Sequence, residues 1–419
     1  MHSAFCIMNL KGVFTRLVSL YAYLLTAIGR YAFPILSFLF LRRTIKYTYP
    51  MRSFLSLTAL QSLFGLSYAL GQPGKVAFSV ICGFGGLILA GCVLGLWGIL
   101  QKRTLLALYL SSLGMCVICA VCPEEAPKQI FALFLGVAGY LFLRWALRSA
   151  KWREWAGKTL IAGSMLLLFV TLLYGREENG AKSWLYFQGV SFQSAELGKL
   201  ALVYAGGLAQ GKGGRLRLLG YGLFSIACLA ISKDFGTALL YFATLTMALF
   251  CYSRLWGTSA LLSGAILGSG AIRIVPRIKG RFAAWGNIWQ APLDSGYQQT
   301  RALSALAAGG LLGLGAGQGQ LPKLFSAASD LATATLGEQW GIFSVIGAVA
   351  ALAALLWERR ENPYFCGAAV ALLSQAALNF FGMVDFLPFT GVPFPFLSNG
   401  GSAMVCAWGM LAFLEVEDD

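Results

Sequence analysis

Long apolar runs separated by short polar stretches recur along almost the whole chain. They lie at roughly residues 18–40, 54–70, 76–100, 105–122, 130–147, 160–174, 195–209, 218–231, 235–252, 260–274, 331–357, 365–381 and 403–414. Most of them approach the roughly 20 residues that a helix needs to cross a bilayer. The pattern therefore predicts an all-α fold, a polytopic membrane protein built from many spanning helices.

The composition supports this prediction. Of the 419 residues 58% are hydrophobic and only 12% are charged, and the mean hydropathy is +0.70, whereas a soluble domain carries about 25% charged residues. The net charge of +15 could also indicate a nucleic-acid-binding protein. No basic stretch is interleaved with stacking aromatic residues, as single-strand binding requires, so we interpret the excess as the basic loops of a membrane protein.

The basic residues also predict how the chain is oriented. Loops that are rich in lysine and arginine alternate with loops that hold few of them, and the rich loops are expected on the cytoplasmic side. The rich loops hold Arg42, Arg43, Lys46 and Arg52; Lys102 and Arg103; Arg144, Arg148, Lys151, Arg153 and Lys158; Lys212, Arg215 and Arg217; Arg254; and Arg359 with Arg360. The acidic C-terminal residues 415–419 are then cytoplasmic as well.

Residues 274–338 form the one long interval that does not have the pattern of a membrane span. By alternation this interval is external, yet it is basic: together with Arg273 just before it, it holds Arg277, Lys279, Arg281, Arg301 and Lys323, against Asp294 and Asp330. Long loops are exempt from the charge rule, so the topology is unaffected. The excess charge has two interpretations, contact with anionic lipid headgroups or a pocket for a pyrophosphate, whose oxygens guanidinium and ammonium groups bind well.

Asp330 is the sharpest candidate for chemistry in this interval. It precedes the apolar segment 331–357, which we predict to be one helix, so it either stabilises the helix dipole or acts as a general base beside the basic residues. Glu338 lies about 12 Å further along that predicted helix at about 1.5 Å per residue. We expect Glu338 to be structural or proton-linked rather than a catalytic partner of Asp330.

Other motifs allow both structural and functional interpretations. Glu196 and Lys199 share a helix face and can form an ion pair. Asp234 stands where a turn enters a helix and is expected to cap it. The glycine run 309–317 either exposes backbone N–H groups to an anion or permits close packing. Residues 379–402 contain prolines and paired glycines, so we predict an irregular external connection that forms a second wall of the same cavity.

The histidine and cysteine residues do not suggest a catalytic or metal site. His2 is the only histidine, which excludes a histidine base or a metal site built on histidines. Cys116, Cys119 and Cys122 have a spacing typical of cluster ligands, but no fourth ligand lies nearby in an apolar segment, and we interpret them as core residues. A catalytic base must then be a carboxylate, Lys, Tyr or Cys.

Taken together, the motifs resemble those of the SEDS family (shape, elongation, division and sporulation), which includes RodA, FtsW and SpoVE. The resemblance rests on four motifs in the family's order: Asn179–Trp184 followed by Glu196 and Lys199; Asp234–Thr237; Gly296–Gln298 with the glycine run, Asp330 and Glu338; and Pro388–Ser402. It covers the chain from about Leu105 to the C-terminus. Departures from the family's usual pattern fall at Ser194–Ala195, Leu331–Thr333, Gln339 and Asn399.

The resemblance implies a fold and an activity. It implies a ten-helix bundle over residues 104–419 with an external catalytic loop at 275–330, and it makes residues 1–103 extra N-terminal membrane helices. It implies a peptidoglycan glycosyltransferase that polymerises lipid II at the outer face of the bacterial cytoplasmic membrane, for division, elongation or sporulation. The expected partner is a class B penicillin-binding protein, a transpeptidase. A lipid II flippase and a non-catalytic scaffold for that transpeptidase remain the alternatives.

The resemblance also implies roles for individual residues. The family's catalytic acid falls on Asp330, which would also hold a divalent cation, Mg²⁺ or Mn²⁺. The residues expected to bind the substrate or its pyrophosphate are Arg277, Lys279, Arg281, Lys323, Glu196, Lys199, Ser398 and Ser402.

Overall fold

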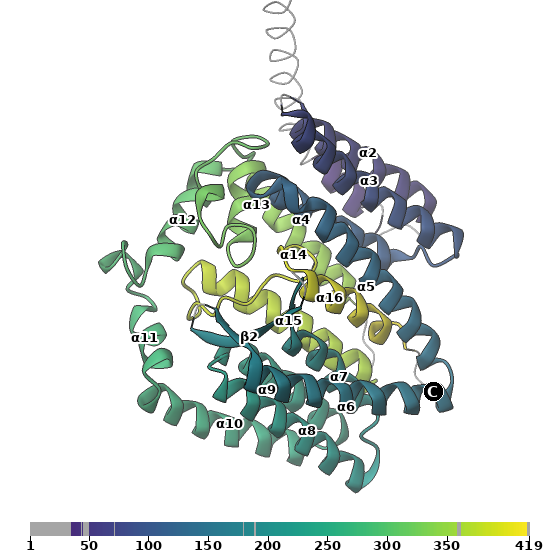
Figure 1. The fold of residues 1–419 in the computed structure, drawn as a ribbon, viewed down its shortest axis with the longest axis vertical. Coiled ribbons are helices and arrows are strands. Elements are labelled where there is room, and N and C mark those ends of the chain that lie inside the picture. Colours follow the sequence, from purple (N-terminus) through teal and green to yellow (C-terminus); the bar gives the residue numbers. More distant parts are fainter. Residues whose placement is uncertain are drawn as a thin grey trace, which may run out of the picture. The chain divides into compact units, whose positions relative to one another are not determined.

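The computed structural model describes residues 35–42, 44, 50–70, 72–178, 180–187, 190–357 and 362–416, and nearly all of its regular structure is helical (Figure 1). The helices are α2 (Pro50–Ala69), α3 (Gly74–Leu96), α4 (Lys102–Val121), α5 (Ala126–Leu147), α6 (Ala150–Tyr174), α7 (Ser194–Gly207), α8 (Gly211–Ile231), α9 (Phe235–Tyr252), α10 (Arg254–Ile274), α11 (Pro276–Ala284), α12 (Tyr297–Gly309), α13 (Ala332–Trp340), α14 (Ile342–Leu355), α15 (Pro363–Met383) and α16 (Gly401–Leu414), with the short 3-10 helices η1 (Pro123–Glu125), η2 (Ile288–Gln290) and η3 (Leu321–Lys323).

Within these described residues, 8 helices are long and apolar enough to cross a membrane. Two shorter apolar helices, α14 and α16, accompany them. The prediction of an all-helical polytopic membrane protein is therefore confirmed. Part of the predicted segment 18–40 and the residues Asn179, Arg43, Lys46, Arg359 and Arg360 lie outside the described residues. The predicted boundary between residues 103 and 104 stays a prediction.

The chain forms two compact units. The first comprises Met1–Ile130, Ala302–Ala328 and Ala332–Leu355. Its centre is α4, which packs against α2, α3, α13 and α14. Because α4 is apolar on every side, it is buried along nearly its whole length. Cys116 and Cys119 are among its buried side chains and serve there as small core residues.

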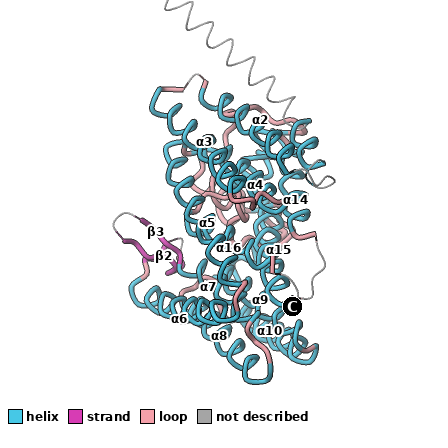
Figure 2. The backbone as a smooth tube through the Cα atoms, turned by 90° about the vertical axis from the view of Figure 1, so that its right-hand side faces the viewer, coloured by secondary structure: helices cyan, strands magenta, loops and turns pink. Residues whose placement is uncertain are grey.

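The second unit comprises Phe131–Arg301, Ser329–Leu331 and Leu356–Asp419. At its centre α7 packs against α6, α9, α15 and α16, and α9 packs against α8 and α10. A small sheet occupies the connection before α7, which has 14 residues. Figure 2 shows the strands of this sheet in magenta, and the sheet contacts α6, α7 and α16.

The sheet was not predicted from the sequence. Strands β1 (Arg176–Glu178), β2 (Ala181–Phe187) and β3 (Val190–Gln193) form an antiparallel sheet in the order β1-β2-β3. The run Trp184, Leu185, Tyr186 and Phe187 is rich in residues that favour strands. Gly180 adopts a φ of +76°, which permits the tight turn between the first two strands.

The interval 274–338 is helical in large part and is not an open loop. It contains α11, η2, α12 and η3. Pro276 opens α11 at a first-turn position, where its missing N–H has no intrahelical partner to lose. The interval is shared between the two units, with residues up to Arg301 in the second and Ala302–Ala328 in the first.

The prediction of one helix over residues 331–357 is wrong, because the segment forms two helices. Gly341, between α13 and α14, has a φ of +77° and a side chain there would meet the carbonyl of Leu311. The glycine run approaches this break: the N–H groups of Leu314 and Gly315 donate to the carbonyls of Glu338 and Gln339, each at 2.9 Å. The run therefore satisfies carbonyls that the end of α13 leaves open.

Candidate active site

Asp330 lies in a three-residue segment of the second unit, Ser329–Leu331, which other elements hold by its backbone. The amide Nδ2 of Asn379, on α15, donates to the carbonyl of Asp330 at 2.9 Å. The hydroxyl of Ser398 donates to the carbonyl of Ser329 at 2.6 Å. The position of the carboxylate is thus set by side chains that are roughly fifty to seventy residues away in the sequence.

An irregular connection between α15 and α16, residues 384–400, covers Asp330, and we call it the Gly391 loop. Gly391 has a φ of +70°, and a side chain at this position would lie 3.3 Å from Oδ2 of Asp330. Asn379 Nδ2 also donates to the carbonyl of Val392 at 2.8 Å, and Ser398 accepts from the N–H of Phe394 at 2.8 Å. The C-terminal connection therefore lies next to Asp330, and its role as the wall of a cavity stays a prediction.

The carboxylate of Asp330 is only partly exposed. Burial raises its pKa to about 7, against the opposing effects of a hydrogen bond with Ser329 and the positive charge of Arg281. A group with a pKa near neutrality exists in both protonation states at working pH, which suits a general base. Asp330 lies two residues before α13, so stabilisation of that helix dipole stays the alternative interpretation.

Arg281 on α11 is the cation that faces Asp330. Burial and the neighbouring Arg277 lower its pKa, while the carboxylates of Asp234 and Asp330 raise it. Among the described residues, none forms a hydrogen bond or an ion pair with its guanidinium group. A guanidinium group carries five N–H donors in a fixed plane. Donors that are not used within the protein are suited to bind phosphate oxygens.

Asp234 and Arg277 hold the elements around Arg281. Asp234 caps α9 by accepting from the N–H of Thr237 at 3.2 Å, which confirms the predicted cap, and it also accepts from Ser183 at 3.1 Å. Arg277 donates to the carbonyl of Gly180 in the β1–β2 turn. Because Arg277 and Arg281 are four residues apart, they share one face of α11.

The other predicted substrate residues divide into two groups. Lys279 is exposed on α11, and Lys323 is exposed in the first unit, where it donates to Gln320 at 2.7 Å. Glu196, Lys199, Ser398 and Ser402 are buried. Glu196 and Lys199 form the predicted ion pair, with 2.7 Å between carboxylate and ammonium. Their roles toward a substrate stay predictions.

Glu338 has a structural environment in the first unit. Its carboxylate accepts from the N–H groups of Gln320 and Leu321 at 2.9 and 3.0 Å. Next to it, Gln339 Oε1 accepts from the hydroxyl of Tyr68, on α2, at 2.6 Å. Tyr68 and its helix α2 precede the region of family resemblance. They are thus joined to α13 at Gln339, one of the positions that departs from the family's usual pattern.

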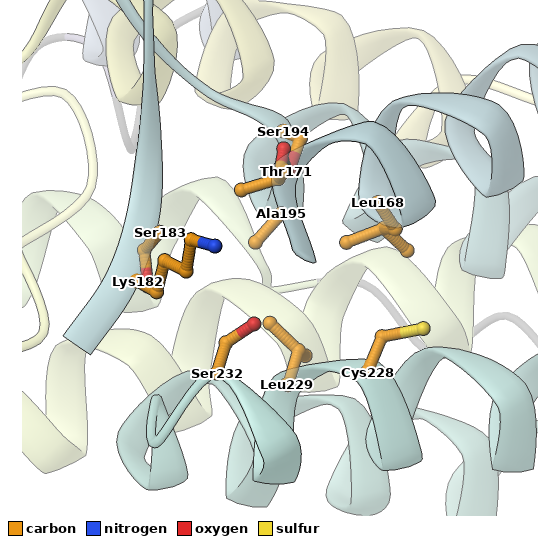
Figure 3. A pocket seen from close by; sticks show the side chains of 9 residues that line it. All are labelled: Leu168, Thr171, Lys182, Ser183, Ser194, Ala195, Cys228, Leu229 and Ser232. Atoms are coloured by element: carbon orange, nitrogen blue, oxygen red, sulfur yellow. Dashed lines mark hydrogen bonds between the residues drawn. The ribbon is translucent and has the colours of Figure 1, made fainter. Parts of the chain in front are cut away.

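A small pocket lies beside the sheet and is distinct from the site around Asp330 (Figure 3). Lys182 and Ser232 turn their polar ends toward it. Thr171 donates to Ser194 at 2.7 Å, and Lys182 Nζ donates to the carbonyl of Leu173 at 2.8 Å. The lining residues are Leu168, Thr171, Lys182, Ser183, Ser194, Ala195, Cys228, Leu229 and Ser232.

Sequence reasoning missed two amides that organise the site, Gln375 and Asn379. Both are buried in α15, and they are one helical turn apart in an otherwise apolar segment. That spacing was a usable signal, because a buried amide in a membrane helix must find partners inside the protein. Sequence reasoning also missed that Asp234 lies near Arg281.

The chain is similar to known proteins over most of its length. The family model described as cell cycle protein, built for FtsW, RodA and SpoVE, matches residues 123–417. A probable peptidoglycan glycosyltransferase FtsW of Tolumonas auensis is 30% identical over 352 residues, covering 74% of this chain and 90% of that protein. The probable peptidoglycan glycosyltransferase FtsW of Saccharophagus degradans is 29% identical over 315 residues, covering 68% and 81%.

Solved structures share the fold. A chain from a study of the structural coordination of polymerization and crosslinking by a peptidoglycan synthase complex matches with a TM-score of 0.59 and 23% identity, covering 76% of this chain and 96% of that chain. The rod shape determining protein RodA of Thermus thermophilus matches with a TM-score of 0.51 and 22% identity, covering 74% and 94%.

Proposed function

The chain belongs to the family of FtsW, RodA and SpoVE, and from that premise we propose that it is a peptidoglycan glycosyltransferase that polymerises lipid II. The observation that carries the proposal is the closeness of two groups: Asp330, whose pKa burial raises to about 7, and Arg281, for whose guanidinium the described residues supply no hydrogen-bond or ion-pair partner. One group can accept a proton and the other can stabilise a phosphate leaving group.

The reaction needs both groups at one place. A sugar hydroxyl attacks the anomeric carbon of a second lipid-linked sugar, and the bond from that carbon to the polyprenyl pyrophosphate breaks. The hydroxyl proton passes to a carboxylate oxygen of Asp330, and the electron pair of the broken bond leaves with the pyrophosphate. Arg281 stabilises that developing negative charge, with Lys279 of the same unit proposed as a further cationic contact.

A divalent cation is a further part of the proposal. Mg²⁺ is commonly held by one or two carboxylates together with substrate phosphates. Within the described residues no group of three or more His, Cys, Asp or Glu side chains could hold a metal ion. A single carboxylate such as Asp330 does not fit a resident metal site. It does fit an ion that arrives bound to the pyrophosphate. When bound, such an ion would neutralise pyrophosphate charge.

The location and partner follow from the same reasoning. We propose that Asp330 faces the outside of the bacterial cytoplasmic membrane, where the lipid tails of the substrate stay in the bilayer. We propose a class B penicillin-binding protein as the partner, supported by the likeness to a chain from a peptidoglycan synthase complex. Cross-linking by that transpeptidase would act on the glycan strands made here.

The test is polymerisation of purified lipid II by the purified full chain, with Asp330→Ala and Asp330→Asn variants. We expect the rate to fall by about 10²- to 10⁴-fold, the range lost with a general base. Asp294→Asn is the matched control, because Asp294 is an exposed acid in the same interval, and it should keep the wild-type rate. Wild-type polymer from Asp330→Ala would remove Asp330 as the base, and lipid movement without polymer would indicate a flippase.

A further inference from the structure

A continuous series of buried polar contacts runs from α7 to the Gly391 loop. Glu196 lies 2.7 Å from the ammonium of Lys199, which donates to Oε1 of Gln375 at 2.8 Å. Nε2 of Gln375 then donates to the carbonyl of Pro393 at 3.0 Å. All three side chains are buried, so a lost contact leaves a polar atom unsatisfied inside the protein.

The ion pair determines which way the Gln375 amide points. An ammonium group can only donate, so it must face the oxygen of the amide. The NH₂ group is thereby left facing the carbonyl of Pro393, which can only accept. Glu196 keeps the ammonium of Lys199 paired at a depth where an isolated charge would be costly.

A second amide acts on the same loop from the next turn of α15. Asn379 donates to the carbonyl of Val392, the neighbour of Pro393, at 2.8 Å. It also donates to the carbonyl of Asp330 at 2.9 Å. Asn379 therefore ties the Gly391 loop and the backbone of Asp330 to one point, while Gln375 fixes the adjacent carbonyl of the loop.

We propose that Gln375 and Asn379 are positioning residues that hold the Gly391 loop over Asp330, and that the Glu196–Lys199 pair serves the site by orienting the Gln375 amide. This inference rests on the proposed function, because it gives these residues a role in glycan polymerisation. It assigns Glu196 and Lys199 to the support of the site and not to contact with the pyrophosphate.

Exchanging the charges of Glu196 and Lys199 tests whether the pair only stabilises the fold or also orients the Gln375 amide. The double variant Glu196→Lys with Lys199→Glu keeps an ion pair, but Glu at 199 accepts from Gln375 and turns the amide oxygen toward Pro393. We expect its unfolding temperature in detergent to stay within a few degrees of wild type. We expect kcat to fall by about tenfold or more, while KM for lipid II changes little.

Hydrogen–deuterium exchange of residues 388–398 measures the loop directly and needs no enzymatic activity. Exchange should accelerate about tenfold in the reversed pair and in Gln375→Met, which removes the amide at nearly constant volume. Gln61→Met is the matched control, because Gln61 is a buried amide on α2 that donates to Ser112 at 2.8 Å. It should leave exchange in the loop and the rate of polymerisation unchanged.

The pH profile distinguishes positioning from a general loss of stability. A loosened loop admits water to Asp330 and lowers its pKa from about 7 toward the ordinary value. The charged group that faces Asp330 is Arg281, which is itself flanked by Arg277 and Asp234, and none of these is altered. The acidic limb of the rate profile should therefore shift to lower pH in Gln375→Met, whereas a purely structural role would leave that limb in place.

Failure of this inference can be told apart from failure of the proposed function. Asp330→Asn should lower the rate of polymerisation by about 10²- to 10⁴-fold and leave exchange in the loop as in wild type. If the wild-type chain forms no polymer, the proposed function fails, and the exchange experiment still decides whether the two amides hold the loop. Wild-type exchange in both the reversed pair and Gln375→Met would overturn the inference.

Discussion

At the scale of single residues, the protonation of Asp330 is balanced between opposing effects. Burial favours the neutral acid, whereas Arg281 and the hydrogen bond with Ser329 favour the carboxylate. The resulting pKa of about 7 lies well above the ordinary value of about 3.9 for an aspartate. A base of this kind loses activity as the pH falls through its pKa, because the proton then already occupies the carboxylate.

Substitution of Arg281 should move that pH dependence in a known direction. Arg281→Gln removes a charge that lowers the pKa of Asp330, so the midpoint of the acidic limb should rise above its wild-type value near pH 7. The rate at high pH should also fall, because the pyrophosphate loses a cation. The measurement is the rate of lipid II polymerisation between pH 5 and 9.

Arg281→Lys is the control for charge at this position. It should keep the midpoint close to wild type, since the positive charge remains, and lose part of the rate, since an ammonium cannot bind phosphate in a bidentate manner. A midpoint in Arg281→Gln that stays in place or moves to lower pH would contradict the proximity of the two groups.

At the scale of elements, the break between α13 and α14 explains the glycine run. In a continuous helix over residues 331–357, the backbone carbonyls would accept hydrogen bonds from N–H groups of the same helix. The N–H groups of the run 309–317 would then find no free carbonyl there. The turn at Gly341 frees carbonyls near the end of α13, and the N–H groups of Leu314 and Gly315 reach them. Positive φ angles at Gly310, Gly313, Gly315 and Gly317 allow this approach.

Gly341→Ala should destabilise the first unit. The φ of +77° disfavours a side chain, and the added carbon would meet the backbone of Leu311 and Leu312, so we expect a loss of about 2 to 5 kcal/mol. The measurement is thermal unfolding in detergent. Gly85→Ala on α3 is the matched control, since no atom lies within 4 Å of the added carbon, and a fall in stability equal to that of Gly341→Ala would refute the explanation.

At the scale of the molecule, loops that the charge pattern assigns to the same side of the membrane meet in the second unit. The β1–β2 turn at Gly180, the cap at Asp234, and α11 with Arg281 come together with Asp330. Arg144 of a predicted cytoplasmic loop pairs with Glu415 at the end of α16. Each grouping joins segments that the charge pattern assigns to one side, and the outward orientation of Asp330 remains our proposal.

Labelling with a membrane-impermeant maleimide tests this topology. On a background without cysteines, a single cysteine at Ser295 should react in intact cells, because Ser295 is exposed in the interval predicted to be external. A cysteine at Lys151, exposed in a predicted cytoplasmic loop, should react only after the cells are permeabilised. The opposite result would place Asp330 on the cytoplasmic side and end the proposal for external polymerisation.

The sequence by itself determined the membrane class and most of the helices, and it supplied Asp330 as the candidate base. These features depend on local information: runs of apolar residues, the positions of charges in loops, and motifs read in order. The pairing of Glu196 with Lys199 and the cap at Asp234 were also predictable, because partners three residues apart on a helix or at its first turn are fixed by helix geometry.

Only the tertiary structure decided what surrounds Asp330. Its neighbours come from α11, α15 and the Gly391 loop, and contacts between residues so distant in sequence leave no local pattern. The roles of Gln375 and Asn379 depend on which carbonyls lie opposite them, and the turn at Gly341 depends on the approach of the glycine run. Periodicity records which face of a helix is apolar, but hydrogen-bond partners are chosen only when the elements have packed.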